Sequence, residues 1–210
     1  QYLSMASGDA RQFSVIPNAF VFPSHQTFSL KKKKEVLIVA RLDDWHKRIL
    51  EALKIWQQVQ LDLSVRDWTL RIVGDGIDLP FYRSYVKKKH IPNISFEGYL
   101  SPLPYYQNAS IFMMTSACEG MPMTLLEAKQ CGCVLIAYNN FASTHDLIQH
   151  GIDGFLVDKD DITDFVSKLK LLMTDETLRQ GMNQANTHPN TSFNISTVAE
   201  QWNQLINQIC

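Results

Sequence analysis

The segment Val36-Leu37-Ile38-Val39-Ala40 decides the fold, because five apolar residues in a row are followed at once by a polar stretch that begins at Arg41. An unbroken apolar run of this length is typical of a strand covered on both faces, as the strands of a parallel sheet are. The next residues, 44 to about 59, carry apolar side chains at helical spacing. The segment therefore predicts a buried parallel strand that leads into a helix.

The same alternation continues along the chain for about 150 residues. Further strands are expected at residues 13–16, 70–73, 94–96, 111–114, 134–137 and 155–157. Further helices are expected at residues 79–90, near 105, at 123–131, 144–150 and 162–172, from 174 onward, and at 195–209. Glycines concentrate at strand exits and helix ends. This pattern predicts an α/β domain with a Rossmann-like parallel sheet flanked by helices and joined by right-handed crossovers.

The overall composition narrows the classes of protein that the chain can represent. Its 210 residues suffice for one domain with terminal extensions, and 45% hydrophobic with 20% charged residues is ordinary for a globular protein. Lys and Arg number 20 against 21 Asp and Glu, and a formal charge of −1 argues against a nucleic-acid binder. The basic run at 31–34 is interpreted as a solvated loop before a buried strand.

The cysteines and the apolar runs bear on the cellular compartment of the protein. The cysteines lack the paired spacing of a zinc site and are interpreted as free thiols: Cys118, Cys131, Cys133 and Cys210. No apolar run approaches the roughly 20 residues that span a bilayer. We therefore expect a cytoplasmic protein, with peripheral association at the inner face of the membrane as the alternative for a full-length protein.

Charged residues follow the strand at 36–40, and in a parallel sheet ligands bind at the carboxyl ends of the strands. Arg41 and Lys47 stand six residues apart at this exit and are suited to the oxygens of a diphosphate. Surface salt bridges are the alternative role for the two cations. Asp43 and Asp44 are interpreted as turn and capping residues rather than as metal ligands.

The strand at 111–114 is followed by a turn with Gly120 that runs into a helix, where free backbone amides form an anion site. Carboxylates beside such a site would repel phosphate but accept hydrogen bonds from hydroxyl groups. Glu119 is therefore assigned to the hydroxyl groups of a donor sugar and Glu127 to those of a ribose. Alternatively, Glu119 is an acid favoured by the helix dipole and Glu127 an exposed helix residue.

Together these segments resemble retaining glycosyltransferases of the GT-B architecture, the large family that includes sucrose synthases, sucrose-phosphate synthases and bacterial envelope glycosyltransferases. The resemblance covers about residues 13–173. Its motifs are Ile16-Pro17-Asn18, Val39-Ala40-Arg41-Leu42-Asp43, Gly74-Asp75-Gly76, Phe96-Glu97-Gly98, Glu119-x7-Glu127 with Leu126-Glu127-Ala128, and Gly151-Ile152-Asp153-Gly154-Phe155-Leu156-Val157. Their common order and spacing carry the resemblance.

The resemblance implies roles for individual residues. Arg41 and Lys47 match the pair that binds the nucleotide diphosphate, while Glu119, with these cations, matches the catalytic group that faces the transferred sugar. Glu127 matches the acid that holds the ribose. The remaining nucleotide-binding positions are Gly74, Gly120, Met121, Met123 and Thr124 along the backbone, with Tyr99 and Leu100 beside the nucleobase. For Tyr99 and Leu100 the alternative is ordinary core or rim packing.

The implied activity is metal-free transfer of a sugar, with retention of configuration, from a nucleotide-sugar donor to a glycan or lipid-linked acceptor. Analogy favours a UDP-sugar, and no other cofactor is implied. Two departures stand out. Arg48 follows Lys47 where the family usually has glycine, which predicts a differently shaped junction. Relatives also carry an N-terminal acceptor domain, to which nothing in this sequence corresponds.

Residues 1–210 are therefore expected to form one nucleotide-sugar-binding domain, the C-terminal half of a GT-B fold. It has an N-terminal extension at 1–12 and C-terminal helices at 175–210, and it is inactive alone. The helix around Trp202 is expected to expose apolar surface to the missing half. A nucleotide-sugar epimerase of similar fold and a non-catalytic nucleotide-binding module are the alternatives. A dinucleotide dehydrogenase is set aside because no G-x-G-x-x-G follows a strand.

Overall fold

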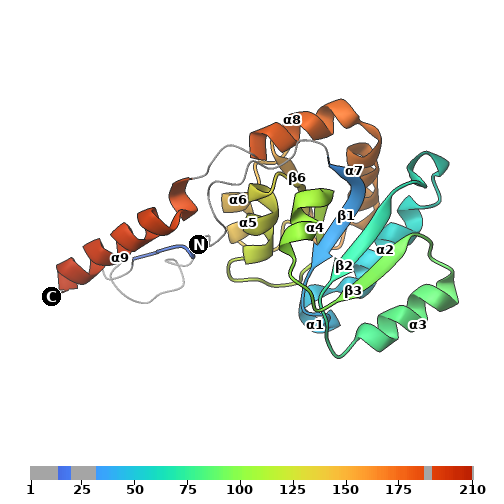
Figure 1. Cartoon of the computed structure of the whole chain (residues 1–210), viewed down its shortest axis with the longest axis horizontal. Helices are drawn as coiled ribbons and strands as arrows, with labels where there is room; N and C mark the ends of the chain where they lie inside the picture. The colour runs from blue at the N-terminus through green and yellow to red at the C-terminus, as the bar shows by residue number, and fades with distance from the viewer. Residues whose placement is uncertain (1–13, 20–31, 187–190, 210) are drawn as a thin grey trace. The chain divides into compact units, whose positions relative to one another are not determined.

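Six parallel strands form one sheet in the order β3-β2-β1-β4-β5-β6. Figure 1 shows β3, β2 and β1 side by side at one edge of this sheet. The computed structural model describes residues 14–19, 32–186 and 191–209. The strands are β1 (Lys33–Val39), β2 (Thr69–Val73), β3 (Ile94–Gly98), β4 (Ala109–Met114), β5 (Val134–Tyr138) and β6 (Gly154–Val157). In the centre, Val36 of β1 pairs with Leu70 of β2 on one side and with Ile111 of β4 on the other. The predicted α/β class with a parallel sheet is confirmed.

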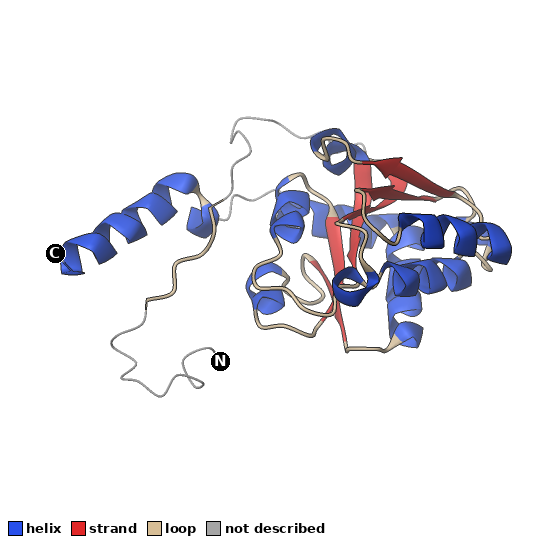
Figure 2. Ribbon diagram, turned by 90° about the horizontal axis from the view of Figure 1, so that it is seen from below, coloured by secondary structure: helices blue, strands red, loops and turns tan. Residues whose placement is uncertain are grey.

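Helices lie on both faces of the sheet, as the view in Figure 2 makes plain. They are α1 (Asp44–Lys47), α2 (Ile49–Val59), α3 (Leu79–Lys89), α4 (Leu103–Asn108), α5 (Met123–Gln130), α6 (Ser143–Leu147), α7 (Ile162–Thr174) and α8 (Glu176–Asn186), with a 3-10 turn at Leu63–Val65. Helices α2 and α7 pack side by side, whereas α4 contacts β1 and β4, and α5 contacts β4 and β5.

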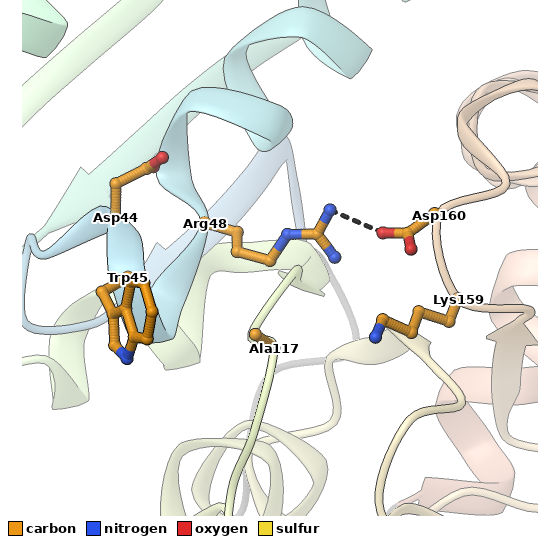
Figure 3. Close-up of a pocket in the computed structure, with 6 residues that line it drawn as sticks. All are labelled: Asp44, Trp45, Arg48, Ala117, Lys159 and Asp160. Carbon is orange, nitrogen blue, oxygen red and sulfur yellow. Dashed lines mark ion pairs between the residues drawn. The ribbon is translucent and has the colours of Figure 1, made fainter.

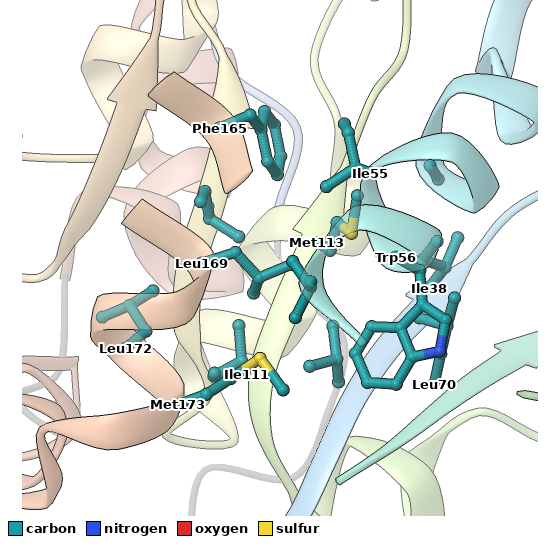
Figure 4. Close-up of a cluster of buried hydrophobic side chains, with 14 of the residues drawn as sticks. Ile38, Ile55, Trp56, Leu70, Ile111, Met113, Phe165, Leu169, Leu172 and Met173 are labelled. Atoms are coloured by element: carbon teal, nitrogen blue, oxygen red, sulfur yellow. The ribbon is translucent and has the colours of Figure 1, made fainter. Parts of the chain in front are cut away.

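The main core lies under α2 and α7, where the buried side chains of alternate strand residues meet those of the two helices (Figure 4). Ile38, Ile111 and Met113 come from the strands, and Trp56 and Phe165 come from the helices. The intervening residues of the same strands are buried on the opposite face, as Leu37 and Phe112 illustrate. Because side chains alternate along a strand, full burial on both faces explains the unbroken apolar runs.

The described chain falls into two compact units, and the sheet belongs to the unit formed by residues 27–188. The other unit contains a 3-10 turn at Thr191–Phe193 and helix α9 (Ile195–Ile209). Helix α9 exposes three large apolar side chains: Ile195, Trp202 and Ile206. No helix of the described residues is both long and apolar enough to span a membrane.

Three local predictions need correction. The strand expected at 13–16 is absent from its described part, residues 14–16, where Ser14 and Val15 are exposed and no strand covers them. Helix α6 ends at Leu147 rather than at residue 150, because Ile148 takes an extended conformation. The lysine run is not wholly solvated, since the Lys32 ammonium group donates to the Tyr106 carbonyl at 2.9 Å. Lys31 lies outside the described residues.

Candidate functional site

The centre of the sheet contains a topological switch point between β1 and β4. The chain leaves β1 toward the face covered by α2 and leaves β4 toward the face covered by α5. Adjacent strands that lead to opposite faces leave a crevice at their carboxyl ends, where open α/β sheets bind ligands. A small pocket lies at this point, and Lys47, Glu119 and Thr124 are among its lining residues.

The loop after β1 is fixed by close contact with the loop after β2. The Ala40 amide donates to the Val73 carbonyl at 3.1 Å, and the Leu42 amide donates to the Asp75 carbonyl at 2.9 Å. A Cβ on Gly74 would lie 1.9 Å from the Ala40 carbonyl oxygen, and the Gly74 φ of +139° also favours glycine. The Gly74 amide donates to the Gly98 carbonyl at 2.8 Å, so this predicted ligand-binding amide is already bonded within the protein.

Capping of the helices explains the two aspartates in this loop. The Asp43 carboxylate accepts the His46 amide at 3.0 Å and pairs with the Arg41 guanidinium at 2.6 Å. Burial acts to raise the pKa of Asp43, but the hydrogen bonds from His46 and Arg41 outweigh it and lower the pKa to about 2. The Asp44 carboxylate accepts the Leu50 amide at 2.8 Å. The predicted capping role is thus confirmed, while the Arg41 side chain remains 67% exposed.

The helix predicted over 44–59 is broken at Arg48, which separates α1 from α2. Arg48 takes a left-handed conformation with φ 50° and ψ 44°. Its guanidinium forms ion pairs with Glu51 and, at 2.6 Å, with Asp160, and it lies 5.8 Å from the centre of the Tyr138 ring. Glycine adopts this backbone conformation most readily. Arg48 therefore adopts at this junction the backbone conformation that glycine favours, and its side-chain contacts stabilise that conformation.

The loop after β4 meets the end of α1 directly. The Ala117 amide donates to the His46 carbonyl at 2.8 Å, and the Thr115 hydroxyl lies 3.1 Å from the Lys47 carbonyl. Beyond this junction the Lys47 ammonium group pairs with the Glu119 carboxylate, and the two side chains are 23% and 16% exposed. The structure thus brings together one cation and one carboxylate predicted for the site.

Helix α5 begins after Pro122, whose carbonyl accepts the Leu125 amide at 3.0 Å. The amides of Met123 and Thr124 belong to the first turn, where a helix offers them no internal acceptor. The Gly120 carbonyl accepts the Ser143 hydroxyl at 2.7 Å. The loop that carries Gly120 and Met121 therefore leads into a helix start whose first amides have no acceptor within the helix.

Glu127 lies about one turn inside α5 and is partly buried rather than fully exposed. Its carboxylate accepts the Tyr106 hydroxyl at 2.8 Å. Burial raises the pKa of Glu127, and the hydrogen bond from Tyr106 opposes that shift. Sequence reasoning missed Tyr106, a fully buried residue of α4. No local pattern distinguishes it from an ordinary core tyrosine, because its partner is 21 residues away.

Tyr99 and Leu100 follow β3, the edge strand of the sheet, and are 88% and 52% exposed. Core packing is therefore excluded for both. Among the described residues, no group of three His, Cys, Asp or Glu side chains is placed to hold a metal ion. The free thiols of Cys131 and Cys133 are buried, which raises their pKa values to about 12 and 11, whereas Cys118 is exposed. Cys210 lies outside the described residues.

A family model described as glycosyl transferases group 1 matches residues 22–188. The amylovoran biosynthesis glycosyltransferase AmsD of Erwinia amylovora is 30% identical over 181 residues, which are 84% of this chain and 49% of that protein. A Campylobacter jejuni enzyme named as an α-1,4-N-acetyl-D-galactosaminyltransferase that acts on a diphospho-undecaprenol-linked glycan is 28% identical over 182 residues, or 86% of this chain and 50% of that protein. The chain spans about half the length of these curated relatives.

Solved structures show the same fold. A variant of S. aureus TarM, in a complex with fondaparinux, α-GlcNAc-glycerol and UDP, matches with a TM-score of 0.81 at 19% identity. The match covers 94% of this chain and 41% of that one. The Rossmann-like sheet is thus that of a GT-B glycosyltransferase, as predicted. With its family-model match across the whole sheet unit, the chain belongs to the group 1 glycosyltransferases.

Proposed function

We propose that the crevice between β1 and β4 binds a nucleoside-diphosphate sugar, and that this chain is the donor-binding half of a retaining glycosyltransferase. The observation that carries the proposal is the pairing of Lys47 with Glu119 across the switch point. A cation beside a carboxylate suits a ligand with a diphosphate at one end and sugar hydroxyls at the other. Relatives named as polysaccharide and glycan transferases are consistent with a glycan or lipid-linked acceptor.

In this proposal Arg41 and Lys47 hold the diphosphate together with the first amides of α5. Glu119 contacts the transferred sugar, and Glu127, oriented by Tyr106, accepts hydrogen bonds from the ribose hydroxyls. The exposed Tyr99 and Leu100 are available to the nucleobase. We infer uridine as the base because the TarM complex contains UDP.

The proposed chemistry requires stabilisation of the leaving group. Departure of the nucleoside diphosphate places negative charge on its distal phosphate. In this proposal the cations of Arg41 and Lys47 and the N-terminus of α5 stabilise that charge. We therefore propose that donor binding and departure need no divalent metal, and that transfer proceeds with retention at the anomeric carbon.

Calorimetric titration of UDP and GDP tests the donor site directly. Arg41→Ala and Lys47→Ala should each weaken UDP binding by on the order of 1.5–3 kcal/mol, because each removes a charge-assisted contact. Arg66→Ala and Lys54→Ala are matched controls, since both residues are exposed and lie outside the crevice. The affinity should be the same with EDTA as with magnesium. Unchanged affinity in both site variants, or a tenfold dependence on metal, contradicts the proposal.

We also propose that this 210-residue chain binds donor without transferring its sugar. Transfer needs both substrates fixed in one water-free site, and the chain spans about half of its relatives. The test compares this chain with a longer form that includes the relatives' additional half, in a donor-consumption assay with mixed glycan acceptors. Equal rates for the two proteins would show that the active site is complete within this chain.

A further inference from the structure

A second pocket, of about 560 Å³, lies next to the donor crevice along the chain, and the residues that line the two do not overlap. Its lining residues come from α1, from Arg48, from the loop after β4 and from the loop after β6: Asp44, Trp45, Arg48, Ala117, Lys159 and Asp160. Figure 3 shows Trp45 on one side and Lys159 and Asp160 on the other, with Arg48 extending between them. Its volume is within the range of about 300–1,000 Å³ that is usual for small-molecule sites.

Most of the charged groups around this pocket are already bonded to other groups of the protein. Arg48 is committed to Asp160 and Glu51, and Asp44 is committed to the Leu50 amide and to the Tyr82 hydroxyl at 3.1 Å. In the described part of the chain Lys159 has no ion-pair partner, and the Asp160 side chain is 56% exposed. One free donor and one accessible acceptor suit a neutral polyhydroxylated ligand better than a phosphate.

Trp45 supplies the apolar surface that such a ligand requires. Its side chain is 87% exposed although tryptophan is usually buried, and α1 buries none of its residues. An indole presents a large rigid face with low conformational entropy, and the C–H face of a sugar ring can stack on it. An exposed indole beside hydrogen-bonding groups is therefore suited to one or two sugar rings.

The position of the pocket indicates which sugar it takes. Arg48 adjoins Lys47, and Ala117 is two residues from Glu119, so the pocket borders the proposed donor site beside the Lys47–Glu119 pair, where the diphosphate and the sugar of the donor would meet. We propose that this pocket holds a neutral sugar ring of the acceptor, stacked on Trp45 and hydrogen-bonded by Lys159 and Asp160. The proposal rests on the proposed function, because the donor site defines which side of the pocket faces the transferred sugar.

The test uses the whole chain labelled with 5-fluorotryptophan and saturated with UDP, and follows the Trp45 fluorine resonance, assigned by its loss in Trp45→Phe. The probes are methyl glycosides of glucose, galactose, mannose, N-acetylglucosamine and N-acetylgalactosamine, with glycerol phosphate as the anionic probe. At least one glycoside should shift the Trp45 signal saturably, whereas glycerol phosphate should not. Lys159→Ala should weaken that glycoside by about fivefold or more, while Lys54→Ala, at an exposed site outside the pocket, should not.

Other outcomes overturn the proposal. No saturable shift with any glycoside, or a shift with glycerol phosphate alone, excludes a neutral-sugar pocket. Loss of the shift in Glu119→Gln would place the ring in the donor site instead. Calorimetry with UDP is read separately: loss of UDP binding in Arg41→Ala and Lys47→Ala supports the donor site whether or not the glycoside binds. Trp45→Ala and Lys159→Ala should leave that UDP affinity within about twofold of the wild type.

Discussion

The loop after β1 and the loop after β4 border the same crevice but are held in different ways. The first, at residues 40–43, is bonded through its backbone to the loop after β2 and is pressed against Gly74 and Gly76. The second, at residues 115–122, is held mainly by side chains: the Thr115 hydroxyl lies 3.1 Å from the Lys47 carbonyl, and Asn140 and Ser143 donate to the carbonyls of Ser116 and Gly120 at 2.8 and 2.7 Å. The loop bonded through its backbone carries Arg41 and leads into α1, where Lys47 lies, whereas the loop held by side chains carries Glu119.

Under the proposed function, this difference suggests a hypothesis for how the two ends of a donor are recognised. A phosphate group is the same in every nucleotide sugar, so its cations can be fixed by backbone that tolerates no change. Sugars differ in the positions of their hydroxyl groups. A carboxylate on a loop that is held by side chains can shift its position to suit different sugars. The following predictions test whether the first loop is rigid and whether the carboxylates are adjustable.

The largest effect is expected from Gly74→Ala. A Cβ there would lie 1.9 Å from a backbone oxygen in a conformation that only glycine adopts readily, and neither strand can move without breaking the sheet. We expect a loss of about 3 kcal/mol in the free energy of unfolding, measured with urea. Gly181→Ala is the control, since a Cβ there would meet no other part of the protein within 4 Å and should stabilise α8 by up to about 1 kcal/mol. Equal stability of wild type and Gly74→Ala would disprove the rigid loop.

Glu127→Gln should stabilise the protein at neutral pH while weakening UDP binding. The folded-state pKa of Glu127 is raised, so folding binds protons there and stability falls as the pH rises above the ordinary carboxyl range. Removing the charge should add on the order of 1 kcal/mol at pH 7, and the gain should vanish below about pH 4. Thermal unfolding across pH measures it, with the exposed Glu200→Gln as control. A loss of stability at pH 7 would contradict this prediction.

Glu119→Gln should tighten UDP binding, because Lys47 is then released from its ion pair before the phosphate arrives. A partly exposed pair of this kind contributes up to about 1 kcal/mol, so we expect an increase in affinity of no more than about fivefold. Calorimetry with UDP measures it. In Lys47→Ala the same Glu119 substitution should have no effect, since no cation remains to be released. An equal increase in UDP affinity in the wild-type and Lys47→Ala proteins would show that Glu119 acts independently of Lys47.

The smallest effect is expected from Arg48→Gly. Glycine relieves a left-handed conformation that costs other residues roughly 1–2 kcal/mol, but it removes the contacts with Glu51, Asp160 and Tyr138. The two terms should cancel to within about 0.5 kcal/mol. Arg48→Ala loses the contacts without the relief and should be about 1 kcal/mol less stable by urea unfolding. If Arg48→Gly is as unstable as Arg48→Ala, the side-chain contacts rather than the backbone dominate.

The sheet could be predicted from the sequence because its strands are buried on both faces and read as unbroken apolar runs. The resemblance drew attention to Arg48, which replaces the family's usual glycine, but the break in the helix could not be predicted, since the apolar spacing of the helical pattern continues through residues 44–59. The caps at Asp43 and Asp44 were predicted because capping is local. Tyr106 and the second pocket were missed because their contacts join distant segments, as the Arg48–Asp160 ion pair shows.

The ion pair between Lys47 and Glu119 also bears on turnover. Under the proposed function, Glu119 turns to the sugar when the donor binds and frees Lys47 for the phosphate. Once the sugar has gone to the acceptor, Glu119 is again free to return to Lys47 at the high effective concentration of a tethered group. The Glu119 carboxylate then competes with the nucleoside diphosphate for Lys47. The protein thus contains a group that would help to release this product.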